Sequence, residues 1–243
     1  DSEKERIYGL IVGHVQSGKT AHFTGLLARA ADRGFNFVIV LSGILNDLRS
    51  QTQARMTRDL FSDKYNEYPD IKSISLDGQK EWNVLTTPTE DMNSGLRDCF
   101  SQEMKNSINE NRILTVVVKK NVSVLQHLLD GIKSRRDELR EKFRVLIIDD
   151  EADHATVNTA GEGDNIDPEL EEEEDEEDDP LEGDTDPSRT NELLRRVIKC
   201  FKKSVYVGYT ATPMANVLIN PGVDDPIFGK SLYPRDFIVA LNQ

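Results

Sequence analysis

The stretch Ile7-Tyr-Gly-Leu-Ile-Val-Gly-His-Val-Gln-Ser-Gly-Lys-Thr20 decides the fold of this chain. Its apolar first half belongs to a strand candidate over 6–13, and its second half, Gly13 to Thr20, matches the pattern G-x-x-x-x-G-K-[ST]. A helix candidate follows from about Gly18 to Arg33. A strand that leads through such a loop into a helix predicts a loop whose backbone N–H groups cradle phosphate.

The residue types in this loop explain its spacing. The two glycines allow a tight turn and a close approach of backbone N–H groups to phosphate oxygens, while the helix directs its positive dipole end at the same anion. Lys19 is expected to reach the β- and γ-phosphates, and the Thr20 hydroxyl to ligate Mg²⁺. The motif therefore predicts that ATP and Mg²⁺ bind here. The predicted nucleotide-binding residues are Gly13, Gln16, Ser17, Gly18, Lys19 and Thr20.

Strand candidates alternate with helix candidates along the rest of the chain. The expected strands are 35–41, 71–76, 113–118, 144–149, 204–209 and 236–241. The expected helices are 45–60, 122–139 and 193–201. Several strands are apolar on both faces, as in a parallel sheet covered by helices. The expected fold is therefore α/β: a RecA-like P-loop NTPase lobe, with a mostly parallel sheet and helices on both faces.

A second signal is Val145-Leu-Ile-Ile-Asp-Asp-Glu-Ala-Asp153, where an apolar strand delivers acidic residues at its carboxyl end. Ligands of open α/β sheets bind at that end. We expect Asp150 to hold Mg²⁺ and Glu151 to orient and polarise the attacking water, with Asp149 as the alternative metal ligand. Taken alone, such a cluster is often only solvated, so this interpretation depends on the glycine loop.

A third signal is Gly208-Tyr-Thr-Ala-Thr-Pro213, again directly after an apolar strand. The hydroxyl groups of Thr210 and Thr212 are placed to hydrogen-bond the acidic cluster and to sense the loss of the γ-phosphate. The alternative is an ordinary turn that ends at Pro213.

The composition is that of one folded domain. The chain has 243 residues, of which 37% are hydrophobic, and no apolar run reaches the roughly 18 residues of a membrane span. We therefore predict a single cytoplasmic lobe over 1–243 with no membrane partner.

The formal net charge is −14, but 162–186 holds 16 acidic residues and no Lys or Arg, so the rest of the chain carries a net charge of +2. An acidic insertion at about 161–187 is expected to be disordered, because it has little apolar surface to bury.

Together these motifs resemble those of superfamily II helicases and translocases. Gly18-Lys19-Thr20 resembles motif I, Asp150-Glu-Ala-Asp153 resembles motif II, and Thr210-Ala-Thr212 resembles motif III. The resemblance implies an ATP-hydrolysing first motor lobe that acts on a nucleic acid, with DNA as the expected polymer.

The chain is also similar to the Z-one domain family, whose members are often described as endonucleases of bacterial restriction and phage-defence loci. Val15–Thr20, Leu48–Gln53 and Gly208–Pro213 carry this resemblance, which extends from about Tyr8 to Asn220 apart from the acidic insertion. It implies a role in such a defence system.

The helicase resemblance also implies nucleic-acid contacts. Residues 41–55 correspond to motif Ia, which contacts the nucleic-acid backbone, and a second contact is expected where another strand ends. The candidates are Arg49, Ser50, Gln51, Lys119 and Lys120. Contacts of this kind are electrostatic and independent of base sequence. The alternative for each basic residue is a solvated surface charge.

The expected partners include more than DNA. A helicase of this type has a second lobe that supplies an arginine finger, and the sequence after Asn220 is too short for one. A second motor lobe, partner subunits of a defence system or a separate nuclease are therefore expected. Without the finger, ATP hydrolysis is expected to be slow, because such a finger contributes about 1000-fold or more.

Two other functions stay open at this stage. One is a nucleotide-gated assembly module that regulates a defence complex without moving along DNA. The other is a metal-dependent nuclease, since Pro69-Asp70 and Glu103-Met-Lys105 loosely fit a P-D…E-x-K pattern. That pattern needs its residues on adjacent strands, whereas Glu103 lies in a stretch with a helical pattern.

Overall fold

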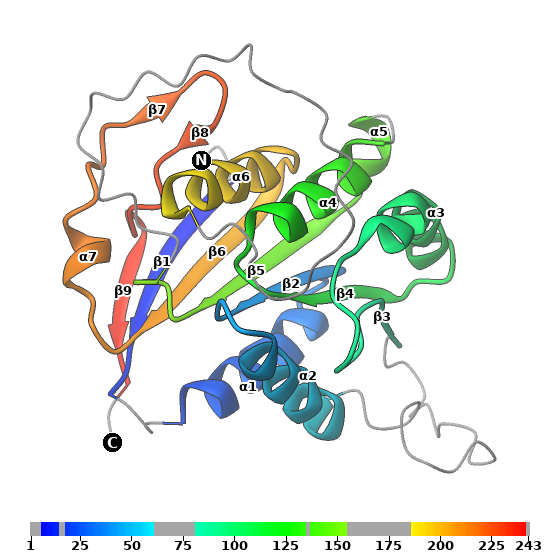
Figure 1. Ribbon diagram of the computed structural model, residues 1–243, viewed down its shortest axis with the longest axis horizontal. Coiled ribbons are helices and arrows are strands. Elements are labelled where there is room, and N and C mark those ends of the chain that lie inside the picture. The colour runs from blue at the N-terminus through cyan, green and yellow to red at the C-terminus, as the bar shows by residue number, and fades with distance from the viewer. Residues whose placement is uncertain (1–5, 15–17, 61–80, 135–136, 155–185, 242–243) are drawn as a thin grey trace.

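The fold is one parallel sheet between two layers of helices (Figure 1). The computed structural model describes residues 6–14, 18–60, 81–134, 137–154 and 186–241. The sheet has seven strands in the order β3-β4-β2-β5-β6-β1-β9, and every pairing within it is parallel. Its strands are β1 Arg6–Val12, β2 Phe37–Ser42, β3 Trp82–Val84, β4 Ile113–Val118, β5 Arg144–Asp150, β6 Lys203–Thr210 and β9 Phe237–Ala240. This confirms the α/β fold expected from the sequence.

The remaining elements surround this sheet. The helices are α1 Lys19–Asp32, α2 Asn46–Leu60, α3 Ser94–Asn109, α4 Val122–Lys133, α5 Asp137–Arg140, α6 Pro187–Lys199 and α7 Met214–Val217. A short antiparallel pair consists of β7 Asp224–Asp225 and β8 Gly229–Lys230. Within the described ranges, no helix is both long and apolar enough to span a bilayer.

Strand alternation explains why the central strands are apolar on both faces. In β2, Phe37, Ile39 and Leu41 join the core under α3, α4 and α6. Val38 and Val40 instead join the core under α1 and α2. Successive strand residues point to opposite faces, so a strand covered on both sides needs an apolar residue at every position.

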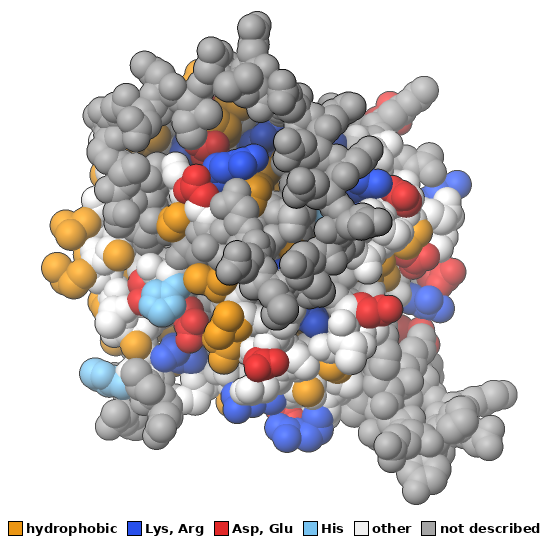
Figure 2. All heavy atoms as spheres, in the orientation of Figure 1, with side chains coloured by type: hydrophobic (Ala, Val, Ile, Leu, Met, Phe, Trp, Pro, Cys, Tyr) orange, Lys and Arg blue, Asp and Glu red, His pale blue; other side chains and the backbone are white. Residues whose placement is uncertain are grey.

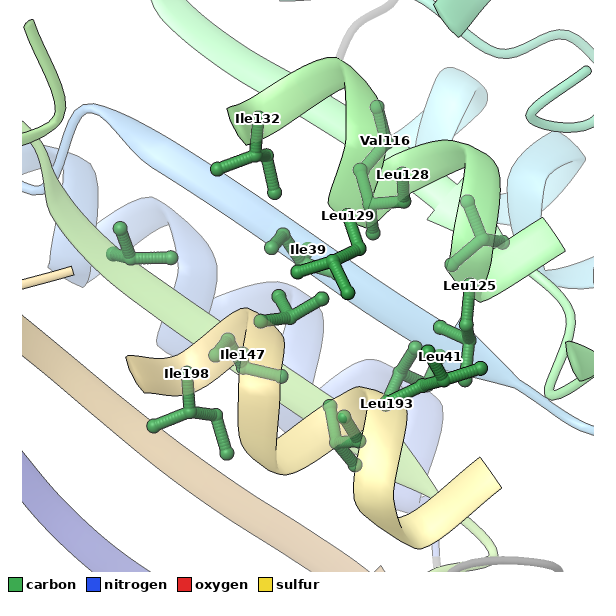
Figure 3. Packing of buried hydrophobic residues seen from close by; sticks show 14 of the residues in the cluster. Ile39, Leu41, Val116, Leu125, Leu128, Leu129, Ile132, Ile147, Leu193 and Ile198 are labelled. Atoms are coloured by element: carbon green, nitrogen blue, oxygen red, sulfur yellow. The ribbon is translucent and has the colours of Figure 1, made fainter. Parts of the chain in front are cut away.

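The larger of the two cores lies between α4, α6 and the sheet. Figure 3 shows these helices side by side above β2 and β5, with Leu125 and Leu129 of α4 and Leu193 of α6 among the residues between them. At one end of this core the ring of Phe37 lies 5.6–6.0 Å, centroid to centroid, from the rings of Phe100, Phe143 and Phe201. Burial of these side chains supplies most of the driving force for the helices to cover the sheet.

Helix caps correct two of the sequence-based boundaries. Asp186 caps α6, because its Oδ1 accepts from the backbone N of Ser188 at 2.8 Å, and Pro187 occupies the first turn. The end of the expected insertion over 161–187 therefore belongs to α6, while 155–185 lie outside the described residues. The helix expected over 122–139 ends at Lys133, and α5 is a separate element.

One expected strand is untested, and one observed strand was not predicted. The strand expected over 71–76 lies outside the described residues. The sequence-based assignment missed β3, which is only three residues long and has a single buried residue, Val84, so it carries little periodic signal.

The aromatic cluster predicts a large stability effect at Phe37. Phe37→Ala is expected to lower the free energy of unfolding by about 3–5 kcal/mol, since it removes a fully buried ring from a packed core. Urea denaturation checks this. Leu218→Ala, at a side chain that is 76% exposed, is the control and should change the value by less than about 0.5 kcal/mol. Equal effects at the two positions would contradict the packing described above.

Candidate functional site

Three loops meet at one edge of the sheet. Val12 at the end of β1 is in register with Thr210 at the end of β6, and Asp150 at the end of β5 is in register with Tyr209. Backbone bonds continue the pairing beyond the strands: Gly13 N donates to Thr210 O at 2.9 Å. The glycine loop, the acidic turn and the threonine turn are therefore neighbours at the carboxyl edge, where ligands of open α/β sheets bind.

The glycine loop ends in a conformation suited to a bound anion. Gly18, directly before α1, has φ 77°, and apart from its chain neighbours the described residues place no heavy atom within 4 Å of where its Cβ would be. The Nζ of Lys19 donates to the carbonyl oxygens of Gly13 and His14, both at 3.1 Å, so the ammonium group lies against the loop. Thr20 is half-buried in the first turn of α1. The predicted residues Gln16 and Ser17 lie outside the described residues.

The neighbouring aspartates of β5 point to opposite faces of the sheet. Asp149 is fully buried on the α4 and α6 side, where its Oδ1 lies 2.8 Å from Lys120 Nζ and its Oδ2 accepts from Tyr206 OH at 2.6 Å. Asp150 therefore points to the α1 side, which carries Lys19. Burial raises the pKa of Asp150. The positive charges of Lys120 and Lys19 partly oppose this rise, whereas the negative charges of Glu151 and Asp149 add to it. The geometry favours Asp150 over Asp149 as the metal ligand.

Glu151 occupies a left-handed backbone conformation. Its φ is 56°, which is uncommon for a residue other than glycine and marks strain of a kind that concentrates at functional sites. Its carbonyl oxygen accepts from Lys120 Nζ at 2.6 Å and from His154 N at 2.8 Å. The His154 ring lies between two acids, 3.6 Å from Glu151 Oε2 and 3.6 Å from Asp153 Oδ2.

The threonine turn binds the acidic turn through Asp153. Thr210 Oγ1 donates to Asp153 Oδ1 at 2.6 Å, and Thr212 Oγ1 donates to Oδ2 of the same carboxylate. Burial acts to raise the pKa of Asp153. These two hydrogen bonds, the backbone N–H of Asp153 and the nearby His154 together outweigh it, so the pKa lies below its usual value. The expected bonding between the hydroxyl groups and the acidic cluster is present, with Asp153 as the acceptor.

Two of the predicted nucleic-acid contacts are buried, which corrects the expectation for them. The side chain of Arg49 is 2% exposed and donates to the carbonyl oxygens of Thr87 and Pro88, both at 2.9 Å. Its Nε also lies 3.5 Å from Asp91 Oδ2. Lys120 is fully buried, as described above. Both charges are internal ions of the fold, and neither reaches the surface.

The other three candidates are more accessible. Gln51 is exposed, while Ser50 and Lys119 are half-buried at the same carboxyl edge. Figure 2 shows basic and acidic side chains interspersed on the described part of one face. Of the nuclease pattern, Asp70 lies outside the described residues, and Glu103 is in α3, where it accepts from Asn83 and Asn106.

A family comparison agrees with this architecture. The family model described as "Type III restriction enzyme, res subunit" matches residues 2–215. This chain belongs to that family. It is accordingly a helicase-like P-loop domain of superfamily II, and helicase-like ATPase activity is the general property of the res-subunit family. No curated protein matches the chain. The finer resemblance to the Z-one family stays a prediction.

Sequence reasoning assigned no role to two residues of the quoted motif that shape this res-subunit domain, Gly208 and Tyr209. Tyr209 is the register partner of Asp150 on the neighbouring strand, and its hydroxyl is 3.0 Å from His22 Nδ1. Burial, followed by the charge of Asp150, raises the pKa of Tyr209. Gly208 is required because a Cβ there would lie 2.9 Å from Ala152 Cβ, inside the acidic turn. Their place in this motif is the only sequence signal for them, because their partners are distant along the chain.

The Asp153 hydrogen bonds predict a pH-dependent stability effect. Thr210→Val is expected to lower the free energy of unfolding by about 1.5 kcal/mol near neutral pH, because a charged acceptor loses a donor. A lowered folded pKa contributes stability above the unfolded pKa, and this contribution is lost as the pH falls through the folded pKa. The difference from wild type should therefore narrow in acid. Urea denaturation across the pH range measures it.

Thr24→Val is the matched control for this experiment. The Thr24 hydroxyl donates to Thr20 O at 2.8 Å, an acceptor that does not titrate. Its stability effect should not vary with the ionisation of Asp153. If Thr210→Val showed the same pH-independent cost, Asp153 would not be the group that the threonine stabilises.

Proposed function

We propose that this chain is an ATP-binding and ATP-hydrolysing motor lobe that acts on DNA in a bacterial restriction or phage-defence system. One observation carries the proposal: the loop with Lys19 and the end of β5 with Asp150 lie at the same carboxyl edge and on the same face of the sheet, where the charge of Lys19 partly opposes the burial that raises the pKa of Asp150. A nucleoside triphosphate with Mg²⁺ needs three kinds of group on one side of the sheet: an ammonium group and the start of a helix for the phosphates, and a carboxylate for the metal.

The residues present fit this ligand pair. The turn at Gly18 and the first turn of α1 supply backbone N–H groups for phosphate oxygens, and Lys19 supplies a positive charge. The Thr20 hydroxyl and the Asp150 carboxylate would hold Mg²⁺, which supplies neutralisation of the charge that develops on the phosphate oxygens. Asp149 is excluded from this set, because both of its oxygens have partners on the opposite face.

Glu151 is the residue proposed to orient the attacking water. Its backbone is held in the left-handed region by bonds to its carbonyl oxygen, so the side chain leaves β5 in a defined direction. Thr210 and Thr212 bind Asp153 in the same turn. A change at the phosphate end would thereby reach β6 and α7 through Asp153, which is the proposed route from hydrolysis to movement.

Exposed apolar side chains support a contact with a partner beside this route. Met214 and Leu218, at α7 just after the threonine turn, are 65% and 76% exposed, and Figure 2 shows hydrophobic side chains over α7. Exposed apolar residues that cluster are typical of protein interfaces. We propose that a second motor lobe or a partner subunit covers this position.

ATP turnover in wild type and two variants tests the proposed catalysis. Glu151→Gln should keep MgATP binding and lower kcat by about 100-fold or more, as expected for loss of a positioned base. Lys19→Ala should raise the Kd for MgATP about tenfold or more, because a charge-assisted contact is lost. Lys133→Ala, at an exposed lysine that ends α4, is the control and should match wild type. Unchanged turnover in Glu151→Gln would refute the assignment.

The same assay separates the alternative functions when single- or double-stranded DNA is added. Stimulation by DNA supports a motor lobe. ATP-dependent binding of a partner without DNA stimulation supports a nucleotide-gated module instead. Cutting that survives Lys19→Ala but not Asp70→Ala supports a nuclease.

Lys119 is the basic residue kept as a proposed DNA contact. Lys119→Ala should weaken binding to duplex DNA and reduce the slope of log K against log salt by about one, because one phosphate contact is removed. Fluorescence anisotropy at several salt concentrations measures this slope. Lys142→Ala, at an exposed lysine before the amino end of β5, is the control. Equal slopes for both variants would count against a contact at Lys119.

A further inference from the structure

Lys120 lies at the centre of a buried polar network. It follows β4, its side chain is fully buried, and its ammonium group has three N–H donors. Three acceptors surround it: Asp149 Oδ1 at 2.8 Å, Glu151 O at 2.6 Å and His154 O at 3.1 Å. Two of these contacts are hydrogen bonds to backbone carbonyl oxygens of the acidic turn, and the third is the ion pair with Asp149.

The position of these two carbonyl groups matters for the direction of the Glu151 side chain. Glu151 and His154 are the first and last residues of a turn that His154 N closes by donating to Glu151 O. Glu151 has φ 56°, a conformation that the surrounding structure must impose on a residue with a side chain. The lysine bonds both ends of this turn from the neighbouring loop, and Asp149 compensates its charge from the far face of β5.

We propose that Lys120 is a positioning residue: its ammonium group holds the turn 151–154 so that the Glu151 carboxylate faces the nucleotide. This inference rests on the proposed role of Glu151. It assigns Asp149 as the counter-ion that allows a charged lysine to be buried. The competing explanation is that Lys120 only neutralises Asp149 and contributes to stability alone.

The two explanations differ once both charges are removed. Lys120→Met alone would leave Asp149 buried and unpaired, which is strongly destabilising. The test therefore compares Asp149→Asn with the double variant Asp149→Asn, Lys120→Met. Asparagine keeps one acceptor oxygen, which can face Lys120, and its amide NH2 can donate to the Tyr206 hydroxyl oxygen. The two variants then differ only at residue 120, whose side chain bonds the two carbonyl groups. The double variant contains neither buried charge.

Two measurements are made on this pair. The double variant should show a kcat for ATP about 10- to 100-fold below that of Asp149→Asn, since a misplaced catalytic group costs this much, with a Kd for MgATP within about threefold. In the nucleotide-free protein, amide hydrogen exchange at Ala152 and His154 should be about tenfold faster, because the turn opens more easily. A kcat within about threefold and unchanged exchange would overturn the proposal.

Tyr206→Phe is the matched control within the same network. It removes the hydrogen bond to Asp149 Oδ2 and leaves the bonds from Lys120 to the carbonyl groups in place. It should lower the melting temperature while kcat stays within about twofold. If its kcat falls as far as that of the double variant, loss of stability explains both and the positioning role is overturned.

Two additions keep the outcome decisive. Glu151→Gln is assayed in parallel. If this variant retains wild-type ATP turnover, the proposed function fails. If it loses turnover while the double variant stays fully active, only the role of Lys120 is refuted. If the double variant does not fold at the assay temperature, Lys120→Gln replaces Lys120→Met. Its amide has two N–H donors on a side chain one atom shorter than that of lysine, so it cannot reach both carbonyl groups as the ammonium does, and kcat should fall about tenfold. Wild-type kcat would overturn the proposal.

Discussion

Parallel pairing of β5, β6 and β1 is the constraint on which the rest of the structure depends. Parallel strands end at one edge, so loops that follow three separate strands become neighbours without any contact between their sequences. The register fixes which residues become neighbours: Val12 lies opposite Thr210, and Asp150 lies opposite Tyr209. Slipping β5 by one residue would exchange the faces of Asp149 and Asp150, and the carboxylate near Lys19 would become the partner of Lys120.

Much of this arrangement was predictable because it is local in sequence. The glycine loop, the apolar strands and the threonine turn are patterns within a few residues. Each predicts one local structure: a tight loop that leads into a helix, burial on both faces, and a polar strand end. The prediction that hydroxyl groups reach the acidic cluster followed from the shared edge alone. Sequence could not choose Asp153 as their acceptor, because that depends on how the turn after β5 is folded.

The errors at Arg49 and Lys120 have one physical origin. A sequence shows that a residue is basic but not whether an acid on another element is placed to pair with it. Arg49 finds Asp91 and two carbonyl oxygens in the loop before α3, and Lys120 finds Asp149 and the acidic turn. Burying a charge is costly unless such partners exist, so the usual expectation of a solvated lysine or arginine fails where they do.

Asp150 shows that the site is built at some expense to the stability of the fold. Burial raises its pKa, with contributions from Glu151 and Asp149, and the charges of Lys120 and Lys19 only partly oppose this. A carboxylic acid whose pKa is raised on folding destabilises the folded state wherever it is ionised, because the unfolded chain holds the charge more easily. A divalent cation bound by that carboxylate would remove the cost. Burial that disfavours the ionised Asp150 carboxylate without a cation therefore favours cation binding by the same group. Ligand binding and folding stability are thus linked at Asp150.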